Sequence, residues 1–214
     1  MIKSILTILC FIGCCFSQIQ QGGSPQYYEN RTDEINFHQV NEDNIVERGF
    51  HPMVFQFGNE YTVDLDFMKS ATLIQNGNNL TYLLGIESTG AYAIGLNFDD
   101  FYLTENSQLF LYDEAQTFFI GSFDSRNNKP QMELNTSVVK SDRIIIELNI
   151  PSTDIDKIKL NISTIIHDYT DIRNYYNTSE SNREDCNINV ICDEGDDWRD
   201  QIDGVIRVQM GGGL

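Results

Sequence analysis

Short runs of alternating apolar and polar residues follow one another between residues 51 and 167. A period of two is typical of strands that bury one face, and clusters of Gly, Asn, Ser and Pro between the runs favour turns. No long run has the helical period of about 3.6 residues. The pattern therefore predicts an all-β fold, an antiparallel β-sandwich with eight or nine strands over 52–57, 61–67, 71–75, 80–87, 92–98, 108–112, 117–123, 143–150 and 157–166.

A hairpin is predicted around residues 114–116. Leu109 and Leu111 alternate with other residues before this tripeptide, and Phe119 and Phe123 continue the alternation after it. Two such runs joined by a short polar segment are typical of a β-hairpin.

Residues 1–17 have the pattern of a secretory signal peptide. A lysine lies near the start, and the apolar run 5–16 is shorter than the roughly 20 residues that a bilayer-spanning helix needs. Ser17 is small and precedes a polar run, so cleavage is expected after Ser17. A lipoprotein anchored through Cys14 is the alternative, which the bulky Phe11 disfavours. The sequence thus predicts a secreted, extracellular protein with no membrane contact after signal removal.

The rest of the chain divides by composition. Residues 18–50 are a leader with weak periodicity, which either wraps the surface or stays mobile, and residues 51–170 are the predicted sandwich. Residues 171–185 are rich in Asn, Ser and Glu without an apolar period, as expected for an exposed linker. Within 186–214, the alternating run 204–210 predicts a strand, and the three glycines after it predict a hairpin turn.

The charge limits the partners. A formal charge of -18 and a pI near 4.3 argue against binding to nucleic-acid backbones, which requires clustered Lys and Arg. A hydrophobic content of 41% is enough to build a core. The acidic surface either keeps an exported protein soluble or faces a basic surface of a partner.

Some acidic residues could suggest chemistry. Asp64 and Asp66 share a face of one predicted strand, and Asp99 and Asp100 are expected in a turn. Among 32 acidic residues such pairs arise by chance, and a solvated surface explains them. The acidic stretch 193–197 lacks the spacing of a calcium-binding EF-hand loop, so a turn is favoured there. No catalytic residue, metal or cofactor is predicted.

After signal removal two cysteines remain, Cys186 and Cys192. A local disulfide is one interpretation, because export implies an oxidising compartment. On an extended strand, however, the two residues would lie roughly 20 Å apart, beyond disulfide reach, and would need partners elsewhere. Two cysteines without a nearby histidine also do not supply the four ligands of a zinc site.

Five Asn-x-Ser/Thr sequons would carry glycans if the host secretes through a glycosylating pathway. They begin at Asn30, Asn79, Asn135, Asn161 and Asn177.

The segment 186–214 resembles the start of the mature domain in the lysyl-endopeptidase branch of trypsin-like serine proteases. That start has a Cys-Asn-x-x-Val-x-Cys block, an acidic Glu-Gly-Asp turn and a Gly-Val-Ile-Arg-Val-like strand before a glycine hairpin. The residues in matching places are Cys186, Asn187, Val190, Cys192, Glu194, Gly195, Asp196, Gly204 and Val205.

The middle of the chain resembles the N-terminal prodomain of the same proteases. A glycine-rich loop of the prodomain is poorly matched at 135–142. The matching pieces are Gly90-Ala91, 98–101, 109–113, 121–123, Asn127-Asn128 and 145–151.

The resemblance implies a secreted serine endopeptidase precursor, a hydrolase zymogen whose propeptide sandwich precedes the first strand of a truncated trypsin-like β-barrel. The chain would end before the catalytic triad and be inactive alone; none of His38, His51 and His167 follows the family's first strand pair, where its base lies. The disulfide partners of Cys186 and Cys192 would lie in the catalytic domain.

The implied partner of the propeptide is its own protease domain, which it would help to fold and would restrain; the activated enzyme would act on protein substrates. Activation cleavage is expected in the linker, where Arg183 is the basic residue of 174–185. The alternative is a free-standing secreted β-sandwich that binds a carbohydrate or a protein. The coding sequence after Leu214 discriminates between the two.

Overall fold

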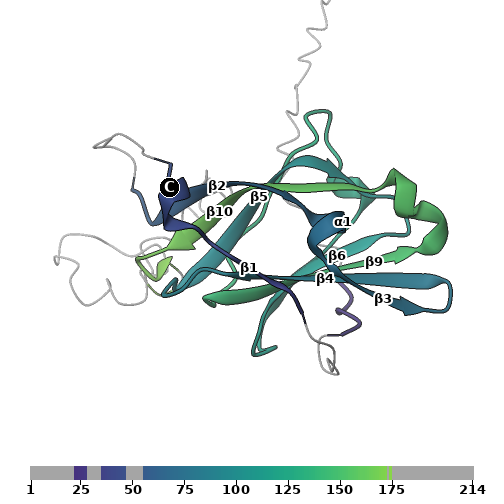
Figure 1. The fold of residues 1–214 in the computed structure, drawn as a ribbon, viewed down its shortest axis with the longest axis horizontal. Helices are drawn as coiled ribbons and strands as arrows, with labels where there is room; N and C mark the ends of the chain where they lie inside the picture. Colours follow the sequence, from purple (N-terminus) through teal and green to yellow (C-terminus); the bar gives the residue numbers. More distant parts are fainter. Residues whose placement is uncertain (1–21, 28–34, 47–54, 173, 175–214) are drawn as a thin grey trace, which may run out of the picture.

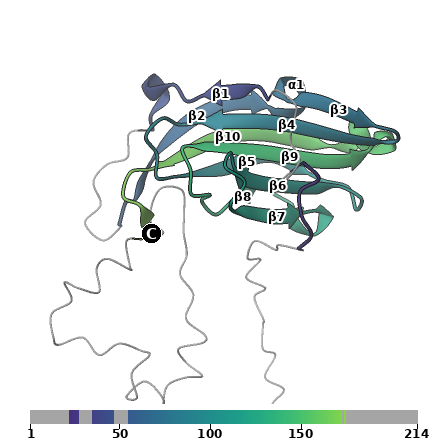
Figure 2. The ribbon, with the colours of Figure 1, turned by 90° about the horizontal axis from the view of Figure 1, so that it is seen from below.

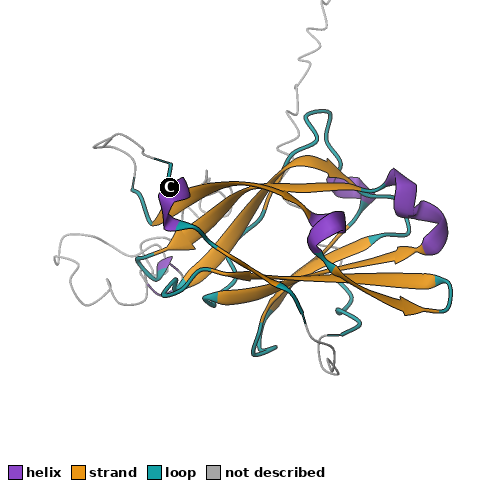
Figure 3. Ribbon diagram, viewed as in Figure 1, coloured by secondary structure: helices purple, strands orange, loops and turns teal. Residues whose placement is uncertain are grey.

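Strands predominate in the part of the chain that this computed structural model describes, residues 22–27, 35–46, 55–172 and 174 (Figures 1 and 3). The prediction of a mostly β chain is confirmed for these residues. One α-helical turn, α1 (Phe67–Ser70), and the 3₁₀ turns η1 (Glu42–Asn44), η2 (Ser125–Asn127) and η3 (Ser152–Lys157) lie between strands. The strands are β1 (Phe37–Gln39), β2 (Gly58–Asp66), β3 (Thr72–Asn76), β4 (Asn79–Glu87), β5 (Ala93–Tyr102), β6 (Gln108–Asp113), β7 (Phe119–Phe123), β8 (Leu134–Asn135), β9 (Arg143–Pro151) and β10 (Lys159–Asp168).

Two sheets form from these strands. The six-stranded sheet has the order β1-β4-β9-β6-β7, with β3 also paired to β4, and the four-stranded sheet has the order β2-β10-β5-β8. The four-stranded sheet is antiparallel, but β1 runs parallel to β4. The expectation of antiparallel pairing throughout is therefore wrong for the six-stranded sheet. Its parallel strand comes from the predicted leader, where no alternation had indicated a strand.

Most predicted strands lie where the alternation placed them, since all except 52–57 coincide with β2 to β7, β9 or β10. Of 52–57, the described residues 55–57 form no strand. Phe67 begins α1 instead of ending β2, because the Asp66 side chain accepts a hydrogen bond from the Lys69 N–H and caps the turn. The predicted hairpin at 114–116 is confirmed as the β6–β7 connection.

The main core lies between the two sheets. It takes alternate residues of β4 and β9 from one sheet and of β5 and β10 from the other, which is why these strands alternate in sequence. Figure 1 shows the two sheets as layers, with β2 and β10 above β3 and β4. The buried members of this core on the four strands are Leu80, Tyr82, Leu84, Ile86, Ile94, Leu96, Phe98, Phe101, Ile144, Ile146, Leu148, Ile150, Leu160, Ile162 and Ile165.

The other face of the six-stranded sheet is covered by residues from the predicted leader. Leu83, Phe110 and Tyr112 are buried there, and Ile35 and Phe37 pack against the same cluster. The purple segment 22–27 lies against this sheet, whereas β1 is a strand of the sheet itself (Figures 1 and 2). Because the sheet is covered on both faces, nearly every residue of β4 and β9 is buried, whichever face its side chain lies on.

Glu147 of β9 ties the N-terminal segment to this sheet. Its side chain is fully buried. Oε1 accepts hydrogen bonds from the Gln26 N–H at 2.5 Å and the Asn149 side-chain amide at 2.7 Å. Oε2 accepts from the Tyr27 N–H at 3.3 Å and the Tyr112 hydroxyl at 3.1 Å. These four donors replace the water that the carboxylate loses on burial.

Candidate functional site

A groove of about 840 Å³ opens where β2, β5 and β10 meet α1 and η3. Carboxylates and aliphatic side chains share its wall. We call it the acidic groove, and it is lined by Asp64, Asp66, Met68, Lys69, Tyr82, Asp99, Asp100, Ile155, Asp156, Ile158, Lys159, Leu160 and Asn161.

The two aspartate pairs found in the sequence meet in this groove. Asp64 and Asp66 are alternate residues of β2, whereas Asp99 and Asp100 lie within β5, so the expectation that they occupy a turn is wrong. Asn161 of the intervening strand β10 joins the pairs. Its side-chain amide donates to Asp64 Oδ1 at 3.2 Å and to Asp99 Oδ1 at 3.0 Å. The groove thus depends on the strand order β2-β10-β5.

Negative charge exceeds positive charge along the groove, since its lining has five aspartates and two lysines. Lys69 Nζ lies 2.6 Å from Asp66 Oδ2, and Lys159 Nζ lies 3.4 Å from Asp100 Oδ1. The hydrogen bond from the Lys69 side chain lowers the pKa of Asp66. Both lysine side chains are mostly exposed, so these ion pairs hold the rim weakly.

Tyr82 lies deep in the groove and is the polar residue that the sequence analysis missed. It belongs to β4 of the opposite sheet and is only 5% exposed. Among the described residues its hydroxyl has no hydrogen-bond partner, and burial raises the pKa of this phenol. The hydroxyl oxygen itself is not fully enclosed and has no partner among the described residues, so it is available to a molecule in the groove. In the sequence, Tyr82 is only one of the residues of the predicted strand 80–87.

Within the described part of the chain, no three acidic, histidine or cysteine side chains are grouped closely enough to hold a metal ion. The aspartates of the groove spread over β2, β5 and η3 instead of converging on one point. The groove accordingly offers hydrogen-bond acceptors to an extended ligand.

A Ser–His pair joins the two sheets elsewhere. Ser88, directly after β4, and His167 of β10 place Oγ and Nδ1 2.8 Å apart. A nucleophile beside a base is the start of a catalytic arrangement, but Ser88 is only 3% exposed and a substrate cannot reach its hydroxyl. The Tyr61 ring packs edge-on against the imidazole of His167, with the two ring centroids 6.2 Å apart. Burial lowers the pKa of His167, against the opposing effect of nearby Asp168. The pair therefore serves as a hydrogen bond between the sheets.

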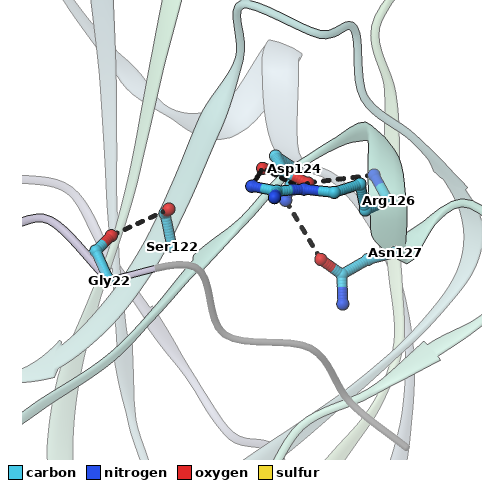
Figure 4. Close-up of polar contacts among 5 residues, drawn as sticks. All are labelled: Gly22, Ser122, Asp124, Arg126 and Asn127. Carbon is cyan, nitrogen blue, oxygen red and sulfur yellow. Dashed lines mark hydrogen bonds and ion pairs between the residues drawn. The ribbon is translucent and has the colours of Figure 1, made fainter. Parts of the chain in front are cut away.

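A second polar network closes the loop after β7 (Figure 4). The Arg126 guanidinium bonds the Asp124 carboxylate and lowers its pKa, and Asn127 Oδ1 accepts from the Asp124 N–H at 3.1 Å. Ser122 donates its hydroxyl to the Gly22 carbonyl at 3.0 Å. The contacts among Asp124, Arg126 and Asn127 stabilise the loop, and the Ser122–Gly22 hydrogen bond holds segment 22–27 beside β7.

Three of the five sequons lie in the described residues. Asn79 begins β4 after a turn and Asn135 ends β8, and both are exposed. Asn161 lies on a central strand and uses its side-chain nitrogen in the hydrogen bonds of the acidic groove. Asn30 and Asn177 lie outside the described residues, and glycosylation stays a prediction at all five.

Other expectations fall outside the described residues as well. They concern the signal peptide with Ser17, His51, the activation site at Arg183, the cysteines Cys186 and Cys192, the acidic stretch 193–197 and the predicted strand 204–210. His38, in contrast, lies in β1, where burial lowers its pKa.

In the described part of the chain, no helix is both long and apolar enough to cross a membrane. Comparison with models of protein families found no match, and comparison with solved structures found none either.

Proposed function

We propose that this chain is the N-terminal part of the precursor of a secreted, trypsin-like serine endopeptidase, and that its described strands belong to the propeptide. One observation carries the proposal: four of the six pieces that resemble the family's prodomain fall in order on β5, β6, β7 and β9. Phe98 and Phe101 of the first piece are buried and contact each other edge to face, with ring centroids 5.9 Å apart. The resemblance thus concerns residues that build this core.

In this proposal the two sheets are the propeptide sandwich, and 171–185 is the linker to the first strand of a trypsin-like barrel. Removal of 1–17 would release the precursor to the outside of the cell. Cleavage near Arg183 would separate propeptide and enzyme. Cys186 and Cys192 would pair with cysteines of the catalytic domain, and the activated enzyme would hydrolyse protein substrates.

The end of β10 supports a propeptide that stays folded after such a cut. The buried Asp168 carboxylate accepts hydrogen bonds from the Thr170 N–H at 2.8 Å and the Ile172 N–H at 2.9 Å. Ile172 is itself buried against Phe57 and Ala93. The turn that ends this sheet thus extends into the first residues of the predicted linker 171–185, and cleavage beyond residue 174 removes none of these contacts.

A propeptide that folds by itself suits the two roles proposed for it. A trypsin-like barrel is built from pairings between distant segments and folds slowly, so a folded neighbour that binds it can stabilise its transition state. The same binding, kept until the linker is cut, would hold the enzyme inactive.

Maturation gives the first experiment. The coding sequence would be read past Leu214 and expressed whole, and the secreted protease would be subjected to N-terminal sequencing. We expect a Cys-Thr-Gly-Ser-like strand and an Ala-Ala-His-Cys-like block in the sequence, and a mature start between residues 175 and 186. An in-frame stop directly after Leu214, or a start upstream of residue 174, would contradict the proposal.

Trans-complementation gives the second experiment. Residues 18–183 would be co-expressed with the separate downstream domain, and the yield of peptidase activity would be measured. We expect the propeptide to raise the yield of folded enzyme and, in excess, to inhibit it. The control is Ile146→Asp, which places a charge in the fully buried centre of β9 and should abolish both effects. Equal yields with and without the propeptide would refute the folding role.

The second candidate function is a free-standing secreted module that binds a carbohydrate or a protein. The acidic groove with its available Tyr82 hydroxyl favours it. It would become the better proposal if the natural reading frame stops at Leu214.

A further inference from the structure

The acidic groove has the chemistry of a site for a cation at the end of a flexible apolar stem. Its rim carries carboxylates, whereas Met68, Ile158 and Leu160 supply aliphatic surface. Ile158 and Leu160 are buried and also belong to the main core, so this surface is fixed by the fold. A ligand that fits must be positive at one end and apolar along its length.

The carboxylates nearest Asn161 have acceptor capacity to spare. Asp64 and Asp99 each use Oδ1 to accept from the Asn161 amide, and among the described residues their Oδ2 atoms accept nothing. Asn161 holds the two carboxylates in place, which reduces the conformational entropy that these side chains would lose when a ligand binds. Two carboxylates held on either side of β10 by the same side-chain nitrogen can receive the several N–H donors of one ammonium or guanidinium group.

The Tyr82 hydroxyl is a second, independent indication of a ligand. The residue is only 5% exposed and lines the groove, yet within the described part of the chain its hydroxyl makes no hydrogen bond. A phenol in this position can accept an N–H from the ligand or donate to a peptide carbonyl.

We propose that the acidic groove binds a lysine or arginine side chain presented by a peptide segment of a partner protein. The ammonium or guanidinium group lies between Asp64 and Asp99, and the methylene stem covers Met68 and Leu160. The peptide reaches the Tyr82 hydroxyl. Long basic side chains combine an apolar stem with a charged head in this way. The rim lysines, Lys69 and Lys159, are exposed and can turn away, since their ion pairs are at the surface. This inference does not depend on the protease proposal.

The test measures peptide binding to the chain from residue 18 to 214 by fluorescence anisotropy. The probes are labelled octapeptides that differ at one central position, which is lysine, arginine, norleucine or glutamate in an otherwise Gly/Ser sequence. Norleucine keeps the stem of lysine and removes its charge. We expect the lysine and arginine peptides to bind at least about tenfold more tightly than the norleucine peptide, and to weaken as salt is raised. Equal binding of the lysine and norleucine peptides would overturn the proposal.

Variants locate the binding. Asp64→Asn with Asp99→Asn should weaken binding of the lysine peptide by at least about tenfold, because both charged acceptors are lost. Tyr82→Phe keeps the ring and should weaken binding of the lysine peptide by about three- to tenfold, since one hydrogen bond is lost. The matched control is Asp43→Asn with Glu133→Gln, which changes the charge equally at exposed positions outside the groove lining and should leave binding unchanged.

Two further outcomes would also overturn the proposal. One is that the control pair weakens binding as much as the groove pair, which would reduce the effect to overall charge. The other is that millimolar calcium displaces the peptide where equal ionic strength of sodium does not, which would make the groove a metal site. Circular dichroism of each variant checks the fold, and the comparison of peptides on the unaltered protein decides the question even if a variant misfolds.

Discussion

Replacing Glu147 by glutamine tests whether a buried carboxylate holds the N-terminal segment on the six-stranded sheet. In the native structure both carboxylate oxygens accept two hydrogen bonds each. Glutamine keeps one acceptor and replaces the other by an NH₂ donor. The less costly orientation places its oxygen towards Gln26 and Asn149, since those hydrogen bonds are the shorter ones, at 2.5 and 2.7 Å. The NH₂ group then faces the Tyr27 N–H and the Tyr112 hydroxyl.

The magnitude follows from these contacts. The Tyr112 hydroxyl can rotate and accept from the new NH₂, but the Tyr27 N–H cannot, so two donors oppose each other in a buried place. The two remaining hydrogen bonds also change from charged to neutral. A hydrogen bond to a charged group contributes about 1.5–3 kcal/mol and an opposed buried donor costs about 1–3 kcal/mol, so we expect Glu147→Gln to lower the free energy of unfolding by about 2–4 kcal/mol.

Urea unfolding of residues 18–214 measures this loss, with Glu133→Gln as the matched control because Glu133 is exposed. Amide hydrogen exchange gives a local readout. The Gln26 and Tyr27 amides should exchange much faster in the variant, whereas amides of β10, in the other sheet, should change only with the global stability. A Glu147→Gln protein within about 0.5 kcal/mol of the native stability would refute the reasoning, because surface substitutions have effects of that size.

Gly85→Ala should detach β1, because a Cβ at Gly85 would lie 2.3 Å from the Phe37 ring. We expect faster amide hydrogen exchange in β1 and a lower urea midpoint of unfolding. Unchanged protection of the β1 amides would contradict this. Stability should also fall between about pH 7 and pH 5. Burial lowers the pKa values of His38 and His167 from the usual 6.5, so below pH 6.5 the unfolded state binds more protons than the folded state. The contribution of these histidines to the free energy of unfolding is therefore complete above pH 6.5 and decreases as the pH falls below it. Urea titrations across this range, with a His38→Gln and His167→Gln double variant that should remove the slope, test this; a native protein that grows more stable towards pH 5 would show the sign to be wrong.

The sequence by itself determined most of the strands. Alternation in β4, β5 and β9 reflects the main core, which takes every second residue over most of each strand, so it could be found without knowing any partner strand. The β6–β7 hairpin was equally accessible, because its two strands are neighbours in the chain. The sequence did not predict the two shortest strands, because β1 has three residues and β8 has two, too few to show a period.

Tertiary structure decided where distant residues meet. Asp64 and Asp99 could be singled out as members of acidic pairs, but only the insertion of β10 between β2 and β5 brings them to the same Asn161. Nothing in the sequence distinguishes Tyr82 from other aromatic residues of the predicted strands, and only the fold shows that it lines the acidic groove. Glu147 gave no signal as the anchor of the leader, since its donors at Gln26 and Tyr27 are about 120 residues away in the chain. A local pattern records which face of a strand is buried, whereas strand order and long-range hydrogen bonds depend on the free energy of the whole fold.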